Sequence, residues 1–287
     1  MAWPADGRPS HIIFDTQEKT TVATKSKTPA AKAPKPAGKS APVRLSLNEV
    51  MSALEKVGTA QARKTYARHG GKEPMFGVSF ADLKILMKRI KVDHELALAL
   101  WATGNFDARN LAVKIADPLS MSVKDLDAWA SEETARICGG YVAHLAAEGP
   151  HGRSRADAWL ASRSAGRRVF GWLLAGILAM RDEDLPTDWF TARLATIEKG
   201  IHAAPNAERE AMNSALISIG CRDAALRKAA VAAAKRIGPV DVDHGDTDCK
   251  TPLAADSIEK AWAYSTAKGF ASPAAQERSR ESTRTRC

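Results

Sequence analysis

Residues 46–57 read SLNEVMSALEKV, and this stretch decides the class of fold. Ser46 and Glu49 have the spacing of a capping box, in which a hydroxyl and a carboxylate satisfy free backbone amides at the start of a helix. Apolar residues then recur at helical spacing, at positions 47, 50, 51, 54 and 57. The stretch therefore predicts an amphipathic helix that buries one face against a neighbour.

The same pattern continues outward along most of the chain, and no alternating pattern of a strand interrupts it. Later helices are predicted over residues 134–147, 155–162, 166–181, 188–200, 206–219, 223–237 and 255–267. Helices of this length, joined by short loops, bury their apolar faces most simply as stacked pairs, so an all-α solenoid is expected. No strict sequence period is evident, which leaves a compact helical bundle as the alternative.

Composition divides the chain into one helical domain and two tails. Residues 1–44 are predicted to be a disordered basic tail, because residues 25–39 read KSKTPAAKAPKPAGK, with five lysines and no acidic residue. That tail is either a soluble spacer or a nonspecific DNA-binding segment. The domain is expected over residues 45–268, including a loop and helix extension at 238–268, and residues 269–287 are expected to form a flexible C-terminal tail.

The charge balance narrows the class of partner. Lys and Arg outnumber Asp and Glu by 42 to 33, giving a net charge of +9, which favours a polyanion and nucleic acid ahead of a membrane surface. No apolar run reaches the ~20 residues of a membrane span. Four scattered cysteines without a CxxC pair, and no secretory signal, indicate a cytoplasmic, nucleoid-associated protein.

Five segments, in this order and spacing, resemble the HEAT-like-repeat DNA alkylation repair family, the alkylpurine DNA glycosylases. The segments are residues 63–78, 82–90, 99–112, 167–174 and 211–220. The resemblance implies an all-α superhelix of HEAT-like antiparallel helix pairs whose concave, basic face binds duplex DNA, with or without alkylated bases. It also implies hydrolysis of the N-glycosidic bond of N3- or N7-alkylated purines without base flipping, assisted by a carboxylate beside the developing sugar cation.

The resemblance also assigns contacts to particular residues. The residues expected to contact DNA are Tyr66, Lys84, Lys88, Arg136, Arg167 and Arg168. For Tyr66 the alternative is a packing role at the end of a helix. For the lysines and the Arg167–Arg168 pair, the alternative is a solvated helix face.

The catalytic element departs from the family pattern. The position of the catalytic aspartate corresponds to Gly139, the preceding Trp-Asp pair corresponds to Ala135-Arg136, and a cleft tryptophan corresponds to Ser214. Loss of these groups should remove most activity by that route, because one preorganised electrostatic group typically contributes about 10²–10³ in rate. The alternatives are a catalytically impaired DNA-binding or damage-sensing module, and a protein-binding scaffold with an apolar concave face.

The loop from Asp241 to Cys249 contains four aspartates, one histidine and one cysteine, which are metal-ligand types. Its spacing is not that of an EF-hand, so a turn that caps the last helices is the favoured interpretation. No metal or cofactor is expected, and the protein is expected to be a monomer.

Overall fold

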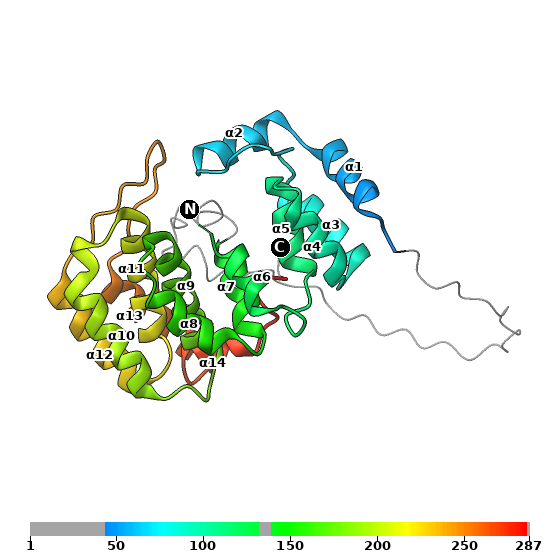
Figure 1. Cartoon of the computed structure of the whole chain (residues 1–287). Helices are drawn as coiled ribbons and strands as arrows, with labels where there is room; N and C mark the ends of the chain where they lie inside the picture. The colour runs from blue at the N-terminus through cyan, green and yellow to red at the C-terminus, as the bar shows by residue number, and fades with distance from the viewer. Residues whose placement is uncertain (1–43, 132–138, 286–287) are drawn as a thin grey trace, which may run out of the picture.

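The computed structural model describes residues 44–131 and 139–285, and every regular element within them is helical (Figure 1). The elements are α1 (Leu47–Val57), α2 (Ala60–Arg68), α3 (Phe80–Ile90), α4 (His94–Ala102), α5 (Phe106–Ile115), α6 (Val123–Trp129), α7 (Gly139–Glu148), α8 (Gly152–Leu160), α9 (Ala165–Arg181), α10 (Thr187–Gly200), the 3₁₀ turn η2 (Ile201–Ala203), α11 (Asn206–Gly220), α12 (Ala224–Ile237), α13 (Ala254–Ala267) and α14 (Pro273–Arg278). Among these helices, none combines the length and hydropathy that a bilayer span requires. The all-α prediction is confirmed, and the helix predicted over 134–147 is described only from Gly139 onward.

Consecutive helices form pairs that stack into a solenoid. α4 packs on α5, α6 on α7, α8 on α9, α10 on α11 and α12 on α13. The second helix of each pair also packs on the second helix of the next, in the series α5, α7, α9, α11 and α13. In Figure 1 the chain follows an arc from α1 to α12, with α5, α7 and α9 on its inner side.

A side-chain repeat links the outer helices, which corrects the expectation that the sequence has no strict period. Trp129, Trp159 and Trp189 are spaced by 30 residues and lie on α6, α8 and α10. The Nε1 atom of Trp159 donates to Asp127 at 2.7 Å, and that of Trp189 donates to Asp157 at 3.0 Å. The indoles of Trp159 and Trp189 therefore hydrogen-bond to the preceding repeat, which fixes the stacking of successive pairs.

Residues 269–285 are folded, in contrast to the flexible tail predicted over 269–287, whose last two residues lie outside the described part of the chain. Ser272 caps α14 by accepting from the amide of Ala275, and Pro273 occupies the first position of this helix. Glu277 is buried and lies 3.3 Å from Arg181 of α9. The charged residues that suggest a solvated tail are thus bound to partners distant in the sequence.

Arg284 ties this C-terminal segment to the N-terminal half of the arc. Its guanidinium donates to the carbonyls of Val113, Lys114 and Ala116 at the end of α5, at 2.7, 3.0 and 3.3 Å. It also binds Glu148 of α7 at 2.7 and 2.9 Å. One buried arginine therefore satisfies the free carbonyls at the end of one inner helix and joins it to the next.

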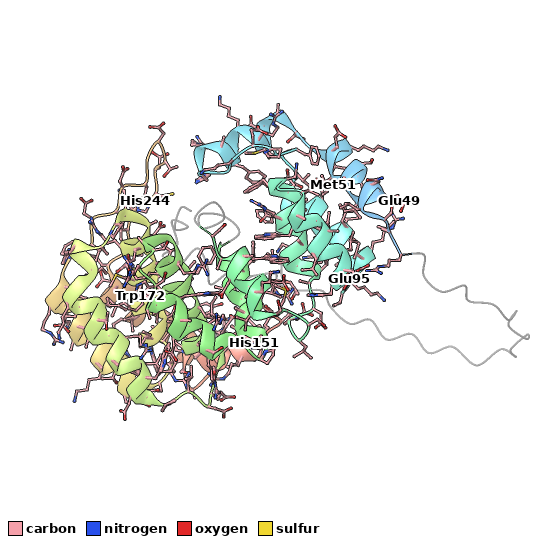
Figure 2. The ribbon with its side chains drawn as sticks, viewed as in Figure 1. Glu49, Met51, Glu95, His151, Trp172 and His244 are labelled. Carbon is pink, nitrogen blue, oxygen red and sulfur yellow. The ribbon has the colours of Figure 1, made fainter. Side chains whose placement is uncertain are left out.

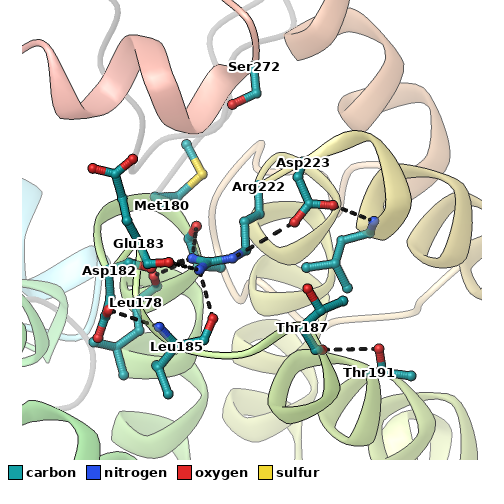
Figure 3. A network of polar contacts seen from close by, with 12 residues as sticks. Leu178, Met180, Asp182, Glu183, Leu185, Thr187, Thr191, Arg222, Asp223 and Ser272 are labelled. Atoms are coloured by element: carbon teal, nitrogen blue, oxygen red, sulfur yellow. Dashed lines mark hydrogen bonds and ion pairs between the residues drawn. The ribbon is translucent and has the colours of Figure 1, made fainter.

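Arg222 caps α9 in the same way (Figure 3). Its guanidinium donates to the carbonyls of Leu178, Ala179, Glu183 and Leu185 at distances from 2.9 to 3.3 Å. Because the last carbonyls of a helix have no partner within the helix, this side chain replaces water at a buried end. The ends of α5 and α9 are therefore fixed by arginines from later in the chain.

Candidate functional site

A pocket lies on the inner side of the arc, between α7, α9 and α11, and is closed at one end by the C-terminal segment. Its lining consists of Gly140, His144, Trp172, Leu173, Gly176, Ile177, Met180, Arg181, Ser214, Ala215, Ser218, Glu277 and Thr283. Most of these side chains are apolar or small. The one arginine, Arg181, is paired with Glu277. A basic concave face was expected, but this part of the inner side is largely uncharged.

Arg168 lies at the start of α9, above this pocket, and is held by an acidic partner. Its guanidinium binds both oxygens of Glu208 at 2.7 Å and donates to the carbonyls of Ser162 and Arg163 at 3.0 Å. The hydrogen bond to Glu208 is the main reason that the pKa of Arg168 is raised. The indole of Trp172 also donates to Glu208, at 3.4 Å. A phosphate contact by Arg168 would have to replace or share this bidentate ion pair, and the contact stays a prediction.

Arg167 points to a different carboxylate from its neighbour. Its guanidinium lies 3.5 Å from Asp127, which also binds Arg155 at 2.9 Å and the indole of Trp159. The two adjacent arginines therefore belong to separate ion pairs and do not form one cationic site.

Tyr66 holds α2 against the rest of the molecule. Its hydroxyl donates to the carbonyl of Val78 at 2.7 Å, and its ring lies 5.2 Å from that of Phe106 and 6.2 Å from that of Phe80. Burial raises the pKa of the Tyr66 hydroxyl to about 12. None of the residues of α2 is itself fully buried. The packing role given above as the alternative is therefore what these contacts support.

Asp107 positions the loop between α2 and α3, and its role was missed in the sequence. This buried carboxylate accepts from the backbone amides of Phe76, Gly77 and Val78 at 2.6, 3.0 and 2.8 Å. Gly77 has a φ of 80°, and a Cβ there would lie 2.4 Å from the carbonyl oxygen of Thr59. The loop therefore depends on a carboxylate and a glycine together. The position of Asp107 in the quoted segment 99–112 was the available signal.

The remaining predicted DNA contacts are not brought together. Lys84 is half-buried and Lys88 is exposed, both on α3 in the N-terminal half of the arc. Arg136 lies outside the described residues. Gly139 is the first residue of α7, next to Gly140 in the pocket lining. Among the described lining residues, the only carboxylate is Glu277, which is bound to Arg181.

Residues 238–252, here called the acidic arm, project from the C-terminal half of the arc, where Figure 2 labels His244. Three side chains of α11 at positions i, i+3 and i+7 anchor it. The hydrogen bonds join Asn206 Nδ2 to the carbonyl of Asp243 at 2.7 Å, Arg209 to the carbonyl of Asp241 at 2.7 Å, and Asn213 to the carbonyl of Pro252 at 3.1 Å. His244 lies 3.0 Å from the hydroxyl of Thr251. In the described part of the chain, no three His, Cys, Asp or Glu residues converge as a metal site.

Charge is distributed unevenly between the two ends of the arc. Residues 44–91, which form α1 to α3, contain ten Lys or Arg and four Asp or Glu. The acidic arm contains four aspartates and one lysine. The excess positive charge of the described residues is therefore concentrated at the N-terminal end and is absent from the pocket.

Comparison with known proteins identifies the family. Residues 50–253 match the model of a family described as DNA alkylation repair enzyme. The chain belongs to the DNA alkylation repair enzyme family. Two relatives of this family member are the uncharacterized proteins Lin0241 of Listeria innocua serovar 6a and Lmo0209 of Listeria monocytogenes serovar 1/2a. Each is 28% identical over 221 residues, which cover 75% of this chain and 95% of the relative.

A solved structure shares the fold of this DNA alkylation repair family member. It is 30% identical, has a TM-score of 0.70, and the match covers 79% of this chain and 96% of the other. It is described as "a new family of proteins related to the HEAT-like repeat DNA glycosylases with affinity for branched DNA structures". The HEAT-like solenoid predicted from the sequence is thereby confirmed.

Proposed function

We propose that this protein binds DNA, prefers branched structures to linear duplex, and does not excise bases. The observation that carries the proposal is the similarity, over 79% of the chain, to a structure from a family with affinity for branched DNA. The basic N-terminal end supports it, since phosphate binding by Lys and Arg supplies most of the sequence-independent affinity for DNA. The pocket, whose one arginine is paired with Glu277, does not offer a track of cations for one continuous duplex.

The absence of excision follows from the chemistry of the pocket. Hydrolysis of an N-glycosidic bond needs a carboxylate near the developing sugar cation. The position that corresponds to the catalytic aspartate is Gly139. Among the described residues, the lining carboxylate Glu277 is bound to Arg181, and Glu208, which accepts from the lining residue Trp172, is bound to Arg168. An arginine-bound carboxylate has its charge compensated, so it stabilises a new cation poorly.

The apolar pocket lining favours one second candidate, a scaffold that binds a protein segment on the inner side of the arc. The two functions are separated by gel shifts at low ionic strength with a linear duplex, a three-way junction and a four-way junction. If the protein binds DNA as proposed, the junctions should shift at a lower protein concentration than the linear duplex. No shift with any of the three refutes DNA binding and leaves the scaffold.

Excision is tested on a duplex containing 7-methylguanine by measuring the released base. The expected result is release at the spontaneous rate, and faster release by the wild-type protein would refute the noncatalytic part of the proposal. The Gly139→Asp variant tests whether position 139 corresponds to the catalytic aspartate, because gain of base release would show that this position faces the lesion.

A further inference from the structure

The end of α3 exposes two large aliphatic side chains close together in the sequence. Ile85 is 66% exposed and Val92 is 65% exposed, and they are two of the four large apolar side chains that are strongly exposed among the described residues. Ile85 lies one turn before Lys88 and Arg89, so these three share a helix face. An exposed aliphatic side chain gains about 25 cal/mol for each Å² of apolar surface that a partner covers.

Cations lie next to these two side chains in the sequence. Lys88, Arg89 and Lys91 are exposed, and within the described residues no carboxylate forms an ion pair with any of them. Glu49 of α1, labelled in Figure 2, is close enough to Arg89 to feel its charge. The surface therefore combines cations that form no ion pair in the described residues with exposed aliphatic groups.

The acidic residue that follows Val92 in the sequence is already bound to a cation. Asp93 forms an ion pair with Arg44, the first described residue of the chain. In the sequence, Arg44 directly follows the lysine-containing residues 1–43. The acidic neighbour therefore does not neutralise Lys88 or Lys91.

The backbone of Lys91 is strained. Its φ of 66° makes it the only residue other than glycine with a positive φ in the described part of the chain. It caps α3, with its amide donating to the carbonyl of Met87 at 2.7 Å. Glycine would adopt this conformation at lower free-energy cost, so lysine at this position destabilises the fold relative to glycine. Strain of this kind is typical of binding sites.

We propose that Ile85, Lys88, Arg89, Lys91 and Val92, here called the α3 corner, are the part of the basic N-terminal end that binds the branch point of a junction. This inference rests on the proposed function. At a branch point the stacked duplex is interrupted, so an apolar base-pair face lies open between converging phosphates. Aliphatic side chains pack against unstacked base steps, and flanking cations bind phosphates. A continuous duplex offers the phosphates but not the open face.

The test compares the affinities of four full-length proteins for a three-way junction and a linear duplex by fluorescence anisotropy. The variants are Ile85→Ser, Lys91→Gly and, as a matched control, Lys235→Ala, which removes an exposed lysine from the last turn of α12. Ile85→Ser is expected to weaken junction binding about tenfold and to leave duplex binding nearly unchanged. Lys91→Gly is expected to weaken junction binding and to lower the salt slope of log affinity by roughly 0.9.

Lys91→Gly also separates function from folding. Relief of the positive φ is expected to raise the Tm by about 2–4 °C while junction affinity falls. A variant that is more stable and binds the junction as tightly as wild type overturns the proposal. Equal losses on junction and duplex also overturn it, because the surface would then bind phosphates only.

Failure of the proposed function gives a different result. Wild-type protein that binds neither DNA overturns both proposals together. If wild-type protein instead binds vesicles containing phosphatidylserine, and Ile85→Ser abolishes that binding, the α3 corner is a membrane surface and the DNA assignment is wrong.

Discussion

Arg284→Ala tests whether a single C-terminal side chain holds the two halves of the arc together. The substitution removes three hydrogen bonds to the carbonyls at the end of α5 and an ion pair in which two guanidinium nitrogens donate to Oε2 of Glu148. The side chain of Arg284 is 5% exposed and that of Glu148 is 19% exposed, so water cannot fully replace either set of contacts.

Removing one partner of a buried ion pair typically costs about 3–5 kcal/mol, and the partial exposure of Glu148 places the expected loss near the lower end, about 3 kcal/mol. For a domain of this size each 1 kcal/mol lowers the Tm by about 2–4 °C, so a decrease of roughly 6–12 °C is expected. Thermal unfolding followed by circular dichroism measures it.

The matched control is Arg236→Ala, which breaks an ion pair with Glu198 on the exposed side of α12 and is expected to leave the Tm unchanged within error. The Glu148→Ala/Arg284→Ala double variant should be more stable than the sum of the single losses predicts, because no unpaired charge remains. An Arg284→Ala Tm within 2 °C of wild type would refute the proposed role of the C-terminal segment.

Three further predictions concern individual groups. Asp107→Asn should lose about 1–3 kcal/mol of stability and speed amide exchange of the 74–79 loop, because an amide cannot accept three backbone hydrogen bonds as well as a carboxylate; protection like wild type would contradict this. The Arg44 guanidinium lowers the pKa of Asp93 below its ordinary 3.8, so this pair stabilises the fold above about pH 4 and loses that contribution as the pH falls further. Urea titrations at pH 7 and pH 3 measure the free energy of unfolding that is lost between the two pH values. This loss should be smaller for Asp93→Asn than for wild type, and equal losses would contradict the stabilising role of the Arg44–Asp93 pair. Burial raises the pKa of Cys221 to about 12, so peptide mapping after treatment of the native protein with a thiol reagent at pH 8 should find Cys249 labelled before Cys221.

The helices could be predicted from the sequence because their signals are local. The capping box at Ser46 and Glu49 forms as expected, with the Ser46 amide donating to Glu49 at 2.8 Å and the Glu49 amide donating to the Ser46 hydroxyl at 3.3 Å. Helix starts and stops depend on residues three or four positions apart, which a single sequence displays directly.

The 30-residue spacing of the tryptophans is visible in the sequence, but only the contacts of these residues show that the spacing joins successive repeats. Trp159 and Trp189 read as ordinary core residues, which they are in part, and their hydrogen bonds to Asp127 and Asp157 join different repeats. A search for an Asp two residues before a recurring Trp would have found Asp127 and Asp157.

The folded C-terminus and the state of the arginines could not be predicted, because their partners are remote in sequence. Arg284 and Glu148 are separated by 136 residues, and Arg168 and Glu208 by 40. From neighbouring residues alone, such charged side chains are predicted to face solvent or phosphate. Only the fold shows that each is compensated, and this moves the expected DNA surface from the inner wall toward the N-terminal end of the arc.

The salt dependence of junction binding shows whether this protein prefers branched DNA and holds it through phosphate contacts. Anisotropy titrations of wild-type protein with a three-way junction and with a duplex of the same length would be repeated across a series of salt concentrations. We expect tighter binding to the junction at every concentration, with log affinity falling linearly with log salt by about 0.9 for each phosphate bound. Equal affinity for the two DNAs, or affinity that does not respond to salt, would contradict it.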